Sequence, residues 1–305
     1  MNKLGIHALV WVSDWTDESI RYAVNKSAEV GYDLIEAVIF DPSEARPVQT
    51  ARALAAAGIG CVTGMALNPG ADISSPDPHV ARRGEQFISD AILATRDMGS
   101  EMLGGVTHSA MHRYLDPAHP AVREQLVEIY GRLADRAQAA GVRLGIEAVN
   151  RYESNVVNTL DDAAQIIAEV GSEALFIHMD TYHMNIEEHD SGDAIVRNSP
   201  LIGHVHIGES HRGYLGSGSV DFPMFFRALA GVGYSGPIVF EAFSPAVLNR
   251  DVANALAAWR SHWSDSEDLA RRALEFMRAQ TAAAQHSLMA RAPIPYRYVM
   301  AEEAV

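Results

Sequence analysis

The feature that most constrains the fold is an alternation of short apolar runs with longer stretches of helical periodicity, which repeats eight times along the chain. Short apolar runs bounded by turn residues predict buried strands, and the amphipathic stretches between them predict covering helices. Eight βα units in 305 residues predict an α/β fold, the (β/α)8 TIM barrel, with an extra C-terminal helix and tail. A doubly wound open sheet usually has fewer units, and no G-x-G-x-x-G turn follows the first run.

The boundaries of these units follow from the apolar runs and from helix-capping residues. We expect strands at residues 4–11, 33–40, 59–65, 102–107, 142–147, 175–180, 202–206 and 238–241. We expect helices at residues 16–30, 43–57, 78–98, 121–140, 160–170, 193–198 and 222–230, and one or two helices within 251–280.

The chain is expected to form one catalytic barrel domain, residues 1–289, because no internal linker interrupts the alternation. Residues 290–305, with Pro293 and Pro295, are expected to form a tail that is extended, disordered or wrapped around a neighbouring subunit. A helix layer near Trp259 and Trp263 is expected to offer an oligomer interface.

The composition of the chain limits the kinds of partner that the protein can bind. The net charge of -15 repels phosphate backbones and anionic lipid, which argues against nucleic acid and membrane surfaces. No apolar stretch is long enough to span a membrane. The single cysteine, Cys61, cannot form an internal disulfide, and the N-terminus lacks the features of a secretory signal, so a cytoplasmic protein is expected.

Four of the later apolar runs end in a polar residue: Glu147, Asp180, His206 and Glu241. All strand ends of a barrel converge on one face, so these side chains should meet there. Three carboxylates packed closely are costly without a cation, and the four residues therefore predict a divalent metal site. Each residue alone is more often a helix cap or a partner of arginine, but four matching strand ends favour the metal.

This ligand set of three oxygens and one nitrogen favours manganese, with magnesium and cobalt as alternatives and zinc left open. The residues beyond the strand ends, including Glu153, His183 and Arg212, suit a small polyhydroxylated or carbonyl substrate. Arg212 could instead pair with Glu209 or Glu153.

Several other side chains allow two interpretations. The sequence supports a core position and a pocket position equally for His7. His178 and His204 are expected to be packed interior histidines, although His204 could also support the metal site. Trp11 and Trp15 are expected either to line a sugar pocket or to belong to the core.

Five segments closely resemble the ketose 3-epimerases, the group of D-tagatose, D-allulose (D-psicose) and L-ribulose 3-epimerases within the xylose-isomerase-like barrels. They are GIHALVW (5–11), EAVNRYESN (147–155), HMDTYHMNIEE (178–188), HVHIGESHRGYLGSGSVDF (204–222) and VFEAF (239–243). The resemblance runs from residue 3 to about residue 280 and leaves the tail unexplained.

The resemblance implies that Glu147, Asp180, His206 and Glu241 bind the metal, and that Glu147 and Glu241 are also the acid/base pair. It implies that Glu153, His183 and Arg212 contact the substrate, a free ketose. It further implies a homodimer or homotetramer. One departure is His7, at or beside which some relatives carry an aromatic ring. We include His7 among the expected substrate contacts, and this departure bears on substrate preference.

The implied chemistry agrees with the residues. Epimerisation at C3 needs two proton-transferring groups on opposite faces of a planar enediolate, and strands 5 and 8 can supply them from roughly opposite sides. Nearer alternatives are an aldose-ketose isomerase, such as hydroxypyruvate isomerase, and an inosose dehydratase. Remoter ones are a metal-dependent abasic-site nuclease, disfavoured by the charge, and a sugar-binding protein without activity, which would not need two opposed carboxylates.

Overall fold

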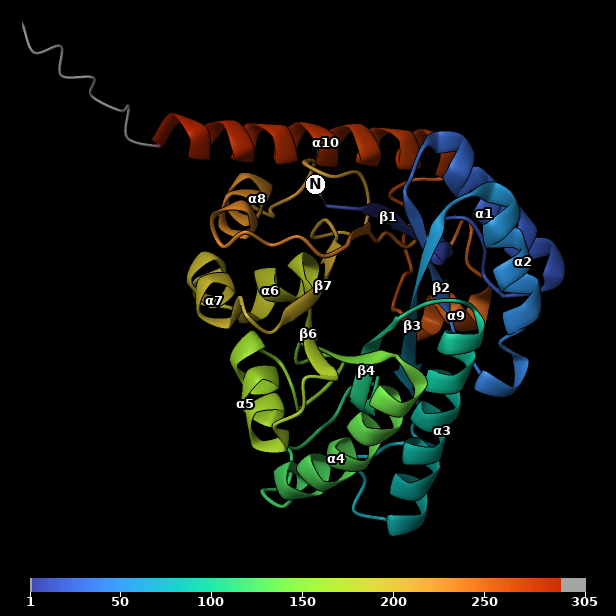
Figure 1. Ribbon diagram of the computed structural model, residues 1–305, viewed down its shortest axis with the longest axis vertical. Helices are drawn as coiled ribbons and strands as arrows, with labels where there is room; N and C mark the ends of the chain where they lie inside the picture. Colours follow the sequence, from blue (N-terminus) through green and yellow to red (C-terminus); the bar gives the residue numbers. More distant parts are fainter. Residues whose placement is uncertain (1, 292–305) are drawn as a thin grey trace, which may run out of the picture.

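The computed structural model describes residues 2–291 and contains a closed barrel of eight parallel strands (Figure 1). The strands are β1 Leu4–His7, β2 Leu34–Val38, β3 Gly60–Leu67, β4 Met102–Ala110, β5 Arg143–Glu147, β6 Leu175–Asp180, β7 Ile202–Ile207 and β8 Ile238–Phe240. β1 pairs with β8 and closes the ring. The predicted (β/α)8 barrel is therefore confirmed.

Helices surround the barrel (Figure 1). They are α1 Asp17–Val30, α2 Pro47–Ala57, α3 Pro78–Asp97, α4 Val122–Ala140, α5 Leu160–Val170, α6 Thr181–Glu187, α7 Ser191–Asn198, α8 Phe222–Gly231, α9 Arg250–Ala255 and α10 Ser266–Arg291, with short 3-10 helices η1 Ala8–Val10 and η2 Pro42–Glu44. Capping residues determine where these helices begin and end. The Thr159 and Asp162 side chains form a capping box at the start of α5. Gly141, with a φ of 69°, ends α4.

Two predicted elements were too long. The first strand ends at His7 rather than at residue 11, because the His7 side chain accepts a hydrogen bond from the Leu9 N–H and starts η1. The helix predicted at residues 43–57 is split into η2 and α2 by Arg46, whose φ is 49°. A residue before proline avoids the right-handed helical region, and Pro47 follows directly.

The C-terminal region also differs from the prediction. Residues 251–280 belong to two helices, α9 and α10, and Trp259 and Trp263 lie in the loop between them rather than on a helix. Trp263 is buried, so it is not available for the expected oligomer interface, whereas Trp259 is exposed. α10 continues to Arg291 and packs beside α8 (Figure 1). The predicted tail lies almost entirely outside the described residues.

Within residues 2–291, none of the helices is long and apolar enough to cross a membrane.

Candidate active site

The four predicted strand-end residues meet at the C-terminal end of the barrel. Glu147 and Asp180 are the last residues of β5 and β6, His206 lies near the end of β7, and Glu241 directly follows β8. His206 Nδ1 lies 3.7 Å from Glu147 Oε1 and 3.5 Å from Glu241 Oε2. All four side chains are buried.

A further carboxylate, Glu36 in β2, was not predicted as a site residue. Glu36 Oε2 accepts hydrogen bonds from His206 Nε2, at 2.7 Å, and from His204 Nε2, at 2.8 Å. His204 is therefore buried as expected, and it is linked to His206 through Glu36. The signal in the sequence was one carboxylate inside the apolar run of residues 33–40, where a buried charge requires partners.

Arg212 joins the site from the loop after β7. Its Nη1 lies 2.8 Å from Asp180 Oδ2 and 2.6 Å from Glu241 Oε2. Its guanidinium stacks over the ring of Tyr182, 3.9 Å from the centroid. Arg212 therefore pairs with two predicted metal ligands, and the alternative pairing with Glu209 or Glu153 is not found among the ion pairs of the described residues.

The other predicted substrate contacts surround this group. His183 Nε2 lies 3.6 Å from Asp180 Oδ2, and the Asn150 N–H donates to His183 Nδ1. The Asn150 side chain donates to Glu153 Oε1 at 2.8 Å. His7 Nε2 lies 3.6 Å from Glu241 Oε1, so His7 belongs to the site and not only to the core. Asn150 thus links two predicted residues.

These side chains line one cavity of about 420 Å³. Seven of the eight predicted site residues form its polar side, together with Glu36 and Tyr182. The eighth, Asp180, does not line the cavity and is paired with Arg212. The opposite side is apolar and comes mainly from the ends of β2 and β3 and from α9; its side chains include Leu9, Phe40, Met65, Leu67, Val252 and Leu256. Trp11 and Trp15 are buried core residues and do not line this cavity.

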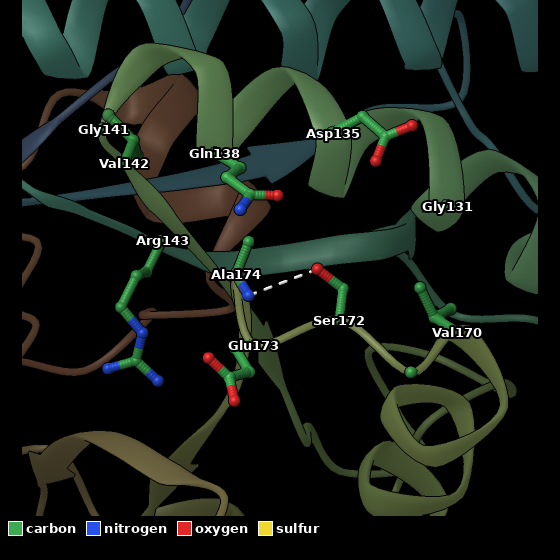
Figure 2. A pocket seen from close by; sticks show the side chains of 11 residues that line it. Gly131, Asp135, Gln138, Gly141, Val142, Arg143, Val170, Ser172, Glu173 and Ala174 are labelled. Carbon is green, nitrogen blue, oxygen red and sulfur yellow. Dashed lines mark hydrogen bonds between the residues drawn. The ribbon is translucent and has the colours of Figure 1, made fainter.

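A larger cavity of about 830 Å³ lies at the opposite end of the barrel, where β5 and β6 begin. Figure 2 shows Arg143 and Glu173 beside it, with the Ala174 N–H bonded to Ser172. It contains none of the predicted site residues. In TIM barrels substrates bind at the C-terminal end of the strands, which favours the smaller cavity.

Burial and neighbouring charges separate the pKa values of the site carboxyls. Burial raises the pKa of Glu147 well above its usual value, and Glu241 and Asp180 add to this effect against the opposing effect of His206. Burial also raises the pKa of Asp180, although Arg212 opposes it. At Glu241, burial would raise the pKa, but Arg212 and His206 lower it well below the usual range. The surroundings thus disfavour the ionised forms of Glu147 and Asp180, whereas Arg212 and His206 favour the ionised form of Glu241.

The side chains fit a metal ion. Ligand atoms of Glu147, Asp180 and His206 lie within 4.8 Å of one another. His206 Nδ1 is buried without a hydrogen-bond partner among the described residues, whereas Glu241 Oε2 is paired with Arg212 Nη1 at 2.6 Å. Because Glu36 binds the opposite ring nitrogen, Nδ1 is free to face a cation. This His/Glu/Asp cluster can therefore bind a metal.

His178 lies one layer deeper and is a packed interior histidine, as expected. Its Nδ1 accepts a hydrogen bond from the Gly105 N–H at 3.0 Å, and its ring lies 4.1 Å from that of His206. A Cβ at residue 104 would come within 2.8 Å of this nitrogen. Gly104 in β4 thus leaves room for the imidazole.

Comparisons with known proteins identify the family of the chain. The family model described as "Xylose isomerase-like TIM barrel" matches residues 24–280. A ketose 3-epimerase from Arthrobacter globiformis is 44% identical over 92% of this chain and 97% of its own. The solved D-allulose 3-epimerase from Methylomonas sp. in complex with D-allulose is 39% identical, with a TM-score of 0.89 over 92% of this chain and 97% of that one.

A solved L-ribulose 3-epimerase covers 100% of both chains at 34% identity and a TM-score of 0.92. Coverage at this level extends over the whole barrel. The chain therefore belongs to the ketose 3-epimerase family of the xylose isomerase-like TIM barrels.

Proposed function

We propose that this protein is a metal-dependent ketose 3-epimerase that inverts C3 of free ketoses of the D-tagatose, D-fructose/D-allulose and L-ribulose type. The observation that carries the proposal is the position of Glu147 and Glu241, which approach His206 Nδ1 from β5 and from the end of β8 within one cavity. Two carboxyl groups on different sides of a substrate can each reach one face of its C3.

In the proposed reaction one carboxylate removes the C3 proton, and the other, as a carboxylic acid, donates a proton to the opposite face of the enediolate. The roles exchange in the reverse direction, so no co-reactant is consumed. Glu147, Asp180, His206 and Glu241 would hold a divalent cation, which would supply Lewis-acid stabilisation of negative charge on the substrate oxygens.

Arg212, His183, Glu153 and His7 are proposed to orient the substrate. The guanidinium and imidazole groups can donate hydrogen bonds to hydroxyl and carbonyl oxygens, and Glu153 can accept from a hydroxyl. Arg212 is the only lysine or arginine among the described residues lining the cavity, and it is already paired with two carboxylates. A phosphorylated sugar would find no free cation there, which supports a free ketose.

Three finer points belong to the same proposal. The ligand set of three carboxylates and one imidazole suits manganese best, with magnesium or cobalt as substitutes. The family resemblance supports a homodimer or homotetramer. Cys61, the lone cysteine, is compatible with a cytoplasmic location.

The deciding experiment incubates the manganese-loaded protein with D-fructose, D-tagatose or L-ribulose in deuterated water and follows the products by NMR. We expect the C3 epimer of at least one of these ketoses, with solvent deuterium at C3. An aldose product would instead assign an aldose-ketose isomerase. In a parallel incubation with an inosose, loss of water from that cyclitol would assign an inosose dehydratase. No turnover of any ketose by metal-loaded protein would refute the proposal.

A further inference from the structure

Glu209 is a buried carboxylate that the proposed reaction does not use. It lies three residues after His206 in the loop between β7 and α8, and its exposed fraction is 0%. Unlike the other buried carboxylates near the cavity, it lacks an ion-pair partner among the described residues and instead accepts hydrogen bonds from the backbone of its own loop.

Both oxygens of the Glu209 carboxylate accept backbone hydrogen bonds. Oε1 accepts from the N–H of Ser210, at 2.7 Å, and of Val220, at 3.3 Å. Oε2 accepts from the N–H of Gly216, at 2.9 Å. Gly218 leaves room for this arrangement, because a Cβ there would collide with Glu209 Oε1. One carboxylate therefore ties together both ends of the loop that carries Arg212.

Arg212 sits in this loop in a conformation that needs support. Its φ is 56°, in the left-handed region that residues with a side chain rarely adopt. Its N–H donates to the Glu209 carbonyl at 2.8 Å. Its own carbonyl accepts from the Phe243 N–H and from Trp263 Nε1, both at 3.1 Å. These contacts hold the backbone of Arg212 in this conformation.

Trp263 completes the support from a distant part of the chain. It is buried, and its carbonyl accepts a hydrogen bond from the Ser244 hydroxyl at 2.7 Å. The backbone of Trp263 is thus held by the segment that follows β8, while its indole N–H donates to the Arg212 carbonyl. The support for Arg212 therefore includes the β7–α8 loop, the segment after β8 and the loop before α10.

We propose that Glu209 is a positioning residue that, together with Trp263, holds Arg212 in its left-handed conformation and so fixes the guanidinium between Asp180 and Glu241. The consequence for substrate orientation rests on the proposed function. The positioning itself does not, and it can be measured without turnover.

The test replaces Glu209 by glutamine and observes the indole N–H signals of the chain labelled with 15N-tryptophan. In Glu209→Gln, the amide NH2 must face a backbone N–H at one of the two former acceptor positions, so the loop cannot keep all three bonds. We expect the Trp263 signal, assigned by its absence in Trp263→Phe, to shift by more than its line width. The Trp15 indole, bonded to the Thr50 hydroxyl at 3.0 Å, should stay in place.

Asp72→Asn is the matched control. Asp72 is also a buried carboxylate in a βα loop that accepts a backbone N–H, from Ser74 at 2.8 Å. It should lower stability without moving the Trp263 signal. If Glu209→Gln loses the Trp15 signal as well and so fails to fold, Gly218→Ala, which displaces the same carboxylate, provides the measurement. An unchanged Trp263 signal in the folded variant overturns the proposal.

Enzyme kinetics then distinguish the proposed epimerase function from the proposed positioning role of Glu209. If wild-type protein epimerises a ketose, Glu209→Gln should lower kcat/KM about 10- to 100-fold, while manganese affinity measured by calorimetry changes much less. Unchanged kcat/KM in Glu209→Gln overturns the role in substrate orientation. If the wild type turns over no ketose, the proposed function fails, and the Trp263 signal still decides the positioning of Arg212.

Discussion

At the scale of single residues, Glu147 and Glu241 have different surroundings although both are buried beside His206. Arg212 lies 2.6 Å from Glu241, whereas Glu147 has histidines as its nearest ionisable partners. The proposed reaction assigns each carboxyl to one face of C3. This division of labour can be tested one residue at a time.

Glu147→Gln and Glu241→Gln should each abolish net epimerisation, by about 10³-fold or more, because one of the two proton transfers is lost. Each variant keeps one base and should still exchange the C3 proton of one epimer with deuterated water, and the two variants should act on opposite epimers. NMR of both epimers with each variant measures this. Exchange of the same epimer by both variants would exclude opposed bases.

Glu36 affects the metal through His206. Its carboxylate accepts the Nε2 hydrogen bonds of His206 and His204, which fixes the His206 ring and adds negative charge near the ligands. Glu36→Gln should weaken manganese binding about 10- to 100-fold, as measured by calorimetry. Glu85→Gln, which removes a carboxylate paired with Arg132 on the outer helices, should leave the affinity unchanged. Equal affinities in the two variants would contradict this role.

At the scale of elements, β4 depends on its glycines. Gly105 has a φ of 106°, and a Cβ there would collide with the Met65 carbonyl of β3. Gly105→Ala should therefore lower the free energy of unfolding by about 3 kcal/mol or more. Gly58 also has a positive φ, of 70°, but open space around it, so Gly58→Ala should cost only about 1 kcal/mol. Urea unfolding midpoints compare the two, and equal losses would refute the packing argument.

The sequence predicted these elements well where periodicity decides the structure. Strands of a closed parallel barrel are buried on both faces, so they appear as continuous apolar runs. Prediction failed where one side chain or backbone angle ended an element, as at His7 and Arg46. The short helix α6 was missed because Thr181–Glu187 is polar and too short for a periodic pattern.

At the scale of the whole molecule, the meeting of Glu147, Asp180, His206 and Glu241 was predictable because strand ends of a barrel converge. Glu36 was not, because it lies within β2 and contacts β7 across the barrel, past β1 and β8. Contacts across the interior depend on side-chain length and inward direction rather than on order along the chain. The strained backbone of Arg212 was equally invisible to pattern analysis.

The metal should stabilise the entire barrel, because its proposed ligands come from four neighbouring parts of the ring, β5, β6, β7 and the end of β8, and the unfolded chain does not bring them together. Manganese at 100 times its Kd should add about 2.7 kcal/mol, which for a chain of this size raises Tm by about 4 °C. Asp180→Asn should lose most of this rise, whereas Glu85→Gln should keep it. Thermal unfolding of chelator-treated protein with and without manganese measures it. An equal rise in wild type and Asp180→Asn would show that the ion binds elsewhere.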